Sequence, residues 1–125
     1  MIRVKRVYDQ NEPDDGPRFL VDRLWPRGLK KQNLPMDGWL KEVAPSAALR
    51  QWFGHDPVKW DEFCRRYNIE LEANSEAWRP LLDMAGKRDL TLLYSAHDTE
   101  HNNAVAIRLF LQKKLNDASQ KSHKT

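Results

Sequence analysis

The chain has one cysteine, five glycines and no long apolar run. Cys64 alone cannot form an internal disulfide or a cysteine-based metal site. No segment approaches the roughly 18 apolar residues of a membrane-spanning helix, and the mean hydropathy is −0.81. The first ten residues, MIRVKRVYDQ, contain no apolar stretch of signal-peptide length. These absences predict a cytoplasmic protein without a membrane partner.

The motifs of three large enzyme classes are also missing. The glycines are too far apart for a P-loop (G-x-x-x-x-G-K-[ST]) or for the dinucleotide fingerprint G-x-G-x-x-G. Neither Ser46 nor Ser95 lies in a G-x-S-x-G elbow. Cys64 lies on an apolar helix stripe, where an inert buried thiol is the usual state.

The hydrophobic pattern predicts three strands. Residues 2–7 alternate apolar and charged side chains, which is typical of a half-buried strand. Residues 18–24 (RFLVDRL) form a second predicted strand, whose apolar centre, Phe19–Val21, indicates burial on both faces. The third predicted strand is 90–94 (LTLLY), which follows a polar turn. The first two strands are connected through the polar loop 9–17, so an antiparallel pairing between them stays open.

Helical periodicity occupies most of the remaining chain. Residues 36–43 are expected to form a short helix, Ser46 to cap a second helix, and Asp56-Pro57 to begin a third. A helix carrying Trp78 and Leu81 should follow Ser75, and the last helix should run from about His101 to Leu115. Strands separated by helices predict one α/β domain over residues 1–116, with a short, mostly parallel sheet of about three or more strands. Residues 117–125 are expected to form a disordered polar tail.

The charge pattern singles out one loop. The formal net charge is only +3, yet no acid lies between Asp22 and Asp37, while Arg23, Arg27, Lys30 and Lys31 do. A solvated surface loop explains such a run of charge, and so does an anion-binding loop. Trp25 and the Pro26–Gly28 turn favour the second interpretation, because a solvated loop does not need them.

Two polar segments follow predicted strands, where open α/β sheets bind their ligands. If the second and third strands are parallel neighbours, these segments meet in one cleft. We expect Asp22 and Asp98 to be its catalytic acid/base residues. The expected ligand-binding residues are Arg23, Trp25, Arg27, Tyr94, Asn102 and Asn103. Each also has a structural alternative, namely an ion pair for Asp22 and Arg23, packing for Trp25, and helix capping for Asp98 or an asparagine.

One string resembles a zinc motif. His97 to His101 reads H-D-T-E-H and matches the H-x-x-E-H pattern of inverted zinc peptidases. That motif needs a helix to place both histidines on one face, whereas this string spans a strand-to-helix turn and has no third ligand. We therefore expect no metal and no cofactor.

Four long motifs resemble the YeaO-like family of bacterial proteins, a domain of unknown function (DUF 488). They are VDRLWPRG (21–28), WLKEVAPS (39–46), LRQWFGHDPVKWDEFCRRY (49–67) and TLLYSAHDTEHNNAV (91–105). The resemblance covers residues 2–115 and implies a small cytoplasmic α/β domain. The family pattern includes Asp22, Arg23, Trp25, Pro26, Arg27, Gly28, Pro45, Ser46, Trp52, Tyr94, Asp98 and Asn103. His97 departs from it, since similar proteins usually carry lysine or another residue there.

Two functional hypotheses remain. In the first, the domain binds a small anionic ligand, such as a nucleotide or sugar phosphate, and is or is not an enzyme. In the second, it is a module that binds nucleic acid or a regulatory partner through the basic loop 23–31. The first is favoured because acids and amides accompany the arginines. The sequence does not fix the oligomeric state.

Overall fold

A computed structural model of the chain describes residues 1–123. Within these residues, four strands form one parallel sheet in the order β1-β4-β2-β3. The strands are β1 (Ile2–Arg6), β2 (Arg18–Leu20), β3 (Gly38–Trp39) and β4 (Leu90–Tyr94). Pairing places Ile2 beside Leu90 and Leu20 beside Leu93. The predicted α/β class and parallel sheet are confirmed.

The position of β4 decides how the first two strands are related. Strands β1 and β2 each pair in parallel with β4, which lies between them, so they do not form an antiparallel hairpin. As expected for a central strand, all five residues of β4 are buried.

The prediction of a helix over residues 36–43 is wrong. Gly38–Trp39 forms β3 instead, and Lys41–Val43 forms a single 3-10 turn. The backbone N–H of Leu40 donates to the carbonyl of Leu20, and the indole N–H of Trp39 donates to the carbonyl of Asp22. These tertiary hydrogen bonds hold the segment extended at the sheet edge, and Gly38 weakens any helix there.

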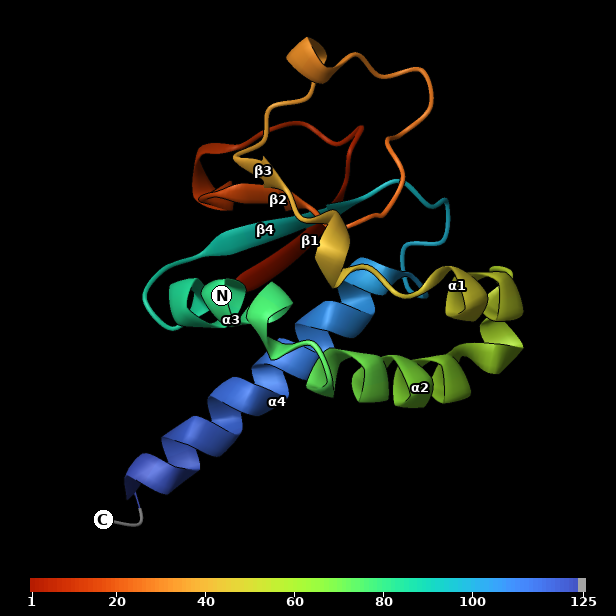
Figure 1. Cartoon of the computed structure of the whole chain (residues 1–125). Coiled ribbons are helices and arrows are strands. Elements are labelled where there is room, and N and C mark those ends of the chain that lie inside the picture. The colour runs from red at the N-terminus through yellow and green to blue at the C-terminus, as the bar shows by residue number, and fades with distance from the viewer. Residues whose placement is uncertain (124–125) are drawn as a thin grey trace.

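The helices gather on one side of the sheet (Figure 1). They are α1 (Ala47–Phe53), α2 (Trp60–Glu72), α3 (Ser75–Ala85) and α4 (Asn103–His123). Ser46 caps α1 as predicted, with its hydroxyl accepting from the backbone N–H of Leu49 at 3.2 Å. Asp56 caps the 3-10 turn Pro57–Lys59, which leads into α2.

The last helix is longer than the sequence pattern indicated. The apolar stripe ends near Leu115, yet α4 continues to His123. No glycine or proline interrupts this stretch, so the helix can continue without an apolar face. Residues 124–125, which also belong to the expected tail, lie outside the described residues.

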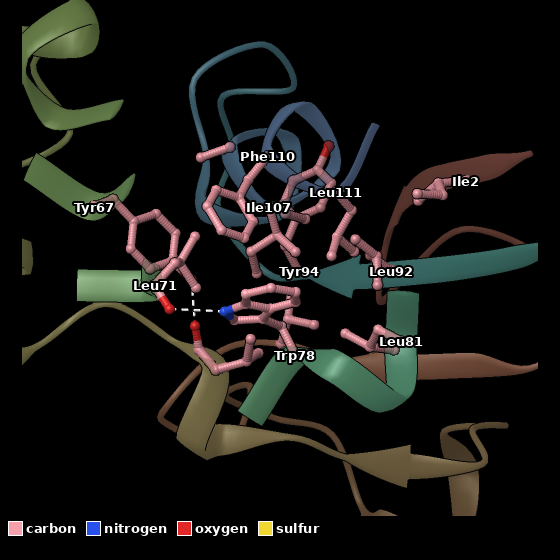
Figure 2. Packing of buried hydrophobic residues seen from close by; sticks show 14 of the residues in the cluster. Ile2, Tyr67, Leu71, Trp78, Leu81, Leu92, Tyr94, Ile107, Phe110 and Leu111 are labelled. Atoms are coloured by element: carbon pink, nitrogen blue, oxygen red, sulfur yellow. Dashed lines mark hydrogen bonds between the residues drawn. The ribbon is translucent and has the colours of Figure 1, made fainter. Parts of the chain in front are cut away.

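The main core lies between the sheet and the helices (Figure 2). Along β4, Leu90, Leu92 and Tyr94 pack into this core, whereas Leu93 faces a smaller cluster with Val7, Leu20 and Leu34. The buried indole N–H of Trp78 donates to the carbonyl of Leu71 at 2.7 Å (Figure 2). Among the described helices, none is long and apolar enough to cross a membrane.

Candidate functional site

A cleft of about 990 Å³ opens beyond the carboxyl ends of β2 and β4. Three segments line it: the loop after β2 (Asp22 to Arg27), the segment from Ser95 to Asn103, and the end of α1 with its turn (Arg50 to His55). The parallel pairing of β2 with β4 brings the first two segments together, although about 70 residues separate them. The predicted meeting of these two segments is therefore present in the structure.

Asp22 connects the two strand ends. Its Oδ2 accepts hydrogen bonds from the backbone N–H and the hydroxyl of Ser95, both at 2.9 Å. Burial raises the pKa of Asp22 above 3.8, while the hydrogen bonds from Ser95 and Asn103 and the charge of Arg50 act to lower it. These contacts make Asp22 a structural connection as well as a cleft residue.

Asp98 organises the turn before α4. Its Oδ1 accepts from the backbone N–H groups of Glu100 and His101, at 2.9 and 3.0 Å. Its Oδ2 lies 2.9 Å from Nδ1 of His101. These hydrogen bonds, first those from the backbone of Glu100 and the His101 ring, lower the pKa of Asp98. The carboxylate therefore stays ionised and fixes the orientation of the His101 ring.

The two asparagines hold the start of α4 in place. Asn102 is 3% exposed, and its side chain donates to the carbonyl of Asp98 and accepts from the backbone N–H of Val105. Asn103 donates to the carbonyl of Val21 at 2.8 Å. Both line the cleft. Asn102 caps α4, whereas Asn103 connects the start of α4 to the chain beyond β2.

Three arginines line the cleft and have spare hydrogen-bonding capacity. The Nε atoms of Arg23 and Arg50 are buried and have no hydrogen-bond partner among the described residues. Within the described residues, the Arg23 side chain donates a single, long hydrogen bond, from Nη2 to the carbonyl of Ala44 at 3.4 Å. Arg27 is exposed at the cleft, and its side chain makes no ion pair or hydrogen bond within the described part of the chain. Buried N–H groups usually have partners, so these two Nε donors are exceptions, as is Nη2 of Arg18, which does not line the cleft.

The two predicted aromatic ligand residues differ in position. Trp25 lines the cleft, but its indole N–H donates to the carbonyl of Leu29 at 2.5 Å and its ring packs edge-on against Trp39. Tyr94 is 3% exposed and does not line the cleft. Tyr94 is buried because both faces of the central strand β4 are covered, and its contact with a ligand stays a prediction.

Sequence reasoning missed Arg50 and His55. The predicted site residues all lie at or beyond the ends of predicted strands, whereas Arg50 and His55 come from the end of α1 and the turn between α1 and α2. Arg50 follows the Ser46 cap by four residues, a position with no visible functional signal. His55 has a φ of 58°, directly after Gly54 with a φ of 55°, and neither value is visible in the sequence.

The structure gives no support to metal or thiol chemistry at this cleft. Over residues 1–123, no group of three or more histidine, cysteine or carboxylate side chains is arranged to hold a metal ion. Burial raises the pKa of Cys64 to about 11, so its thiol stays protonated near neutral pH.

The whole chain matches one family model. That model, described as the inactive DUF488-N3 subclade, covers residues 1–125. The chain belongs to this family. This DUF488-N3 protein is 46% identical to the uncharacterized protein YeaO of Escherichia coli (strain K12) over 111 residues, which is 89% of the chain and 96% of YeaO. The predicted resemblance to YeaO-like proteins is confirmed.

More distant relatives come from mycobacteria. The DUF488-N3 chain is 39% identical over 110 residues to the uncharacterized proteins Rv3073c of Mycobacterium tuberculosis (strain ATCC 25618 / H37Rv) and Mb3100c of Mycobacterium bovis (strain ATCC BAA-935 / AF2122/97). In both cases the match covers 88% of this chain and 92% of the relative. No solved structure matches the chain.

Proposed function

We propose that this protein is a cytoplasmic binding domain for a small anionic ligand that carries a phosphate or a similar group. The main support is that two arginines lining one cleft, Arg23 and Arg50, have buried Nε–H groups without a hydrogen-bond partner among the described residues. Both atoms are covered by the protein, so the two side chains would have to turn toward the cleft to bind an anion. The anion would then satisfy two donors that have no partner among the described residues. Arg27, whose side chain has no partner among the described residues, supplies a third guanidinium of the kind that pairs with phosphate oxygens.

Binding without catalysis is favoured over an enzymatic role. Asp22 and Asp98, the expected acid/base residues, both accept hydrogen bonds that hold neighbouring loops. A general base needs to reach a substrate proton, and carboxylates engaged in this way are poorly placed to do so. The family description as an inactive subclade supports the same preference.

The test is isothermal titration calorimetry with inorganic phosphate and pyrophosphate. Wild type should bind at least one of them saturably, and Arg50→Lys should weaken binding about tenfold or more, because lysine keeps the charge but loses the planar fork. Arg88→Lys is the matched control, since Arg88 is exposed just before β4, away from the cleft. Its affinity should equal that of wild type.

Two outcomes would contradict the proposal. One is the absence of saturable binding to wild type. The other is equal loss in Arg50→Lys and Arg88→Lys, which would indicate nonspecific attraction to positive charge. Tight, strongly salt-dependent binding of a DNA or RNA oligonucleotide without any binding of small anions would support the nucleic-acid alternative instead.

A further inference from the structure

The cleft is much larger than a phosphate group requires. Its volume of about 990 Å³ lies at the upper end of the range for drug-sized ligands. The three arginines occupy only part of the lining, and large apolar or aromatic side chains occupy much of the rest, including Leu24, Phe53, His55 and Phe63. A bare anion or a sugar phosphate would leave this part of the wall without a matching surface.

An aromatic cluster supports one wall. The rings of Phe53 and Phe63 stack at a centroid distance of 4.4 Å, and Trp60 lies 5.6 Å from Phe63. His55 and His101 rest on this cluster, His55 at 6.5 Å from Phe53 and His101 at 5.3 Å from Trp60. Both imidazoles line the cleft, and the His101 ring is also held by its hydrogen bond with Asp98.

The backbone at His55 is held in a costly conformation. Its φ of 58° lies in the left-handed region, which a residue with a Cβ adopts at an energetic cost. Residues held in this way concentrate at functional sites. A glycine would adopt the same backbone more easily, so the presence of histidine here points to a use for its side chain.

A second wall segment exposes an unusual amount of apolar surface. Leu24, in the loop after β2, is 65% exposed and lines the same cleft. Arg23 and Arg27 lie on either side of it in the sequence, so a ligand bound by these guanidiniums is within reach of the Leu24 side chain. A flat heteroaromatic ring would cover this surface.

We infer that the anionic ligand is a nucleoside phosphate, whose base packs against His55 and Leu24 while its phosphate binds the arginines. The inference rests on the proposed anion-binding function. It adds that another part of the same cleft binds the base of the nucleotide. Base stacking on aromatic side chains tolerates different bases, because every base has a π face. The ring subsite is therefore expected to distinguish nucleotides from sugar phosphates more strongly than one base from another.

The experiment compares adenosine 5′-monophosphate with ribose 5-phosphate by calorimetry on the same protein. Wild type should bind the nucleotide about tenfold or more tightly, the effect expected of one stacked base. In His55→Gly this advantage should fall to about threefold or less, while the affinity for ribose 5-phosphate stays unchanged. Glycine suits the left-handed backbone, so this variant is expected to fold.

Leu24→Ser provides a second variant, and Val58→Ser is the matched control. Val58 is 91% exposed and does not line the cleft, so its replacement should leave both affinities unchanged. Equal wild-type affinities for the nucleotide and the sugar phosphate would overturn the ring subsite while leaving anion binding intact. A nucleotide advantage that survives in both His55→Gly and Leu24→Ser would also overturn it. If neither compound binds, the proposed anion-binding function fails as well.

Discussion

Asp22 and Ser95 lie 73 positions apart in the sequence and are joined by two hydrogen bonds of 2.9 Å to one carboxylate oxygen. The contact connects the chain just beyond β2 to the chain just beyond β4, which are parallel neighbours. Asn103 reinforces it by donating to the adjacent carbonyl of Val21. Asp22 and Ser95 both line the cleft, so this contact also fixes the backbone position of the next residue, Arg23.

Removing the Ser95 hydroxyl should loosen this contact. Ser95→Ala deletes one hydrogen bond to a charged group, and we expect the free energy of unfolding to fall by about 1–2 kcal/mol. Urea denaturation at neutral pH measures the loss. Ser119→Ala, at an exposed position of α4, is the control and should change stability little. A Ser95→Ala variant as stable as the control would mean that the contact contributes nothing.

The raised pKa of Asp22 predicts a specific pH dependence. Between its usual value near 3.8 and the raised value, the folded protein binds more protons at this group than the unfolded chain does. Its contribution to the free energy of unfolding therefore decreases as the pH rises through that window. Asp22→Asn removes this decrease. We expect the free energy of unfolding of the variant, minus that of wild type, to increase as the pH is raised from about 4 to about 7, as measured by urea denaturation. A decrease in this difference over the same pH range would contradict the raised pKa of Asp22.

The rings of the aromatic cluster differ in burial, and the loss of stability on removing each ring should follow that difference. Phe63 is 2% exposed, so Phe63→Ala should cost about 3–5 kcal/mol, as for other buried aromatic residues. Trp60 is only partly buried, and Trp60→Ala should cost clearly less. Chemical denaturation of both variants tests the order. The reverse order would show that Trp60, and not Phe63, anchors α2.

Much of the fold was predictable from hydrophobic patterns. The apolar run Leu90–Tyr94 predicted a strand, and the structure has β4 at these residues. Polar residues directly after two strands predicted that Asp22 and the segment from Asp98 to Asn103 would meet, because parallel strands end at one sheet edge. These predictions depend on periodicity and topology, which a single sequence carries.

Other features depend on tertiary contacts that leave no periodic signal. Residues 36–43 have helical spacing of apolar side chains, but Trp39 and Leu40 bond to the backbone of residues 22 and 20 and form an edge strand. Arg50 belongs to the cleft only because α1 packs with that face toward the strand ends. Tyr94 looked available at a strand end, yet the sheet and helices bury it.

Arg27 offers a functional test that is separate from folding. Its side chain is exposed and without a protein partner among the described residues, so Arg27→Lys should leave the melting temperature nearly unchanged. Because the planar fork is lost, phosphate binding should weaken several-fold. Differential scanning fluorimetry and calorimetry measure the two effects. A markedly lower melting temperature with unchanged phosphate affinity would make Arg27 a structural residue.

The most direct test of the account is an NMR titration that follows the arginine Nε–H groups with inorganic phosphate. We expect saturable shifts of the Arg23 and Arg50 Nε–H resonances, because these donors have no partner among the described residues and would bind the phosphate. The exposed Arg88 should not shift. If the Arg23 and Arg50 signals stay unchanged at phosphate concentrations that alter other residues, the cleft is not the anion site.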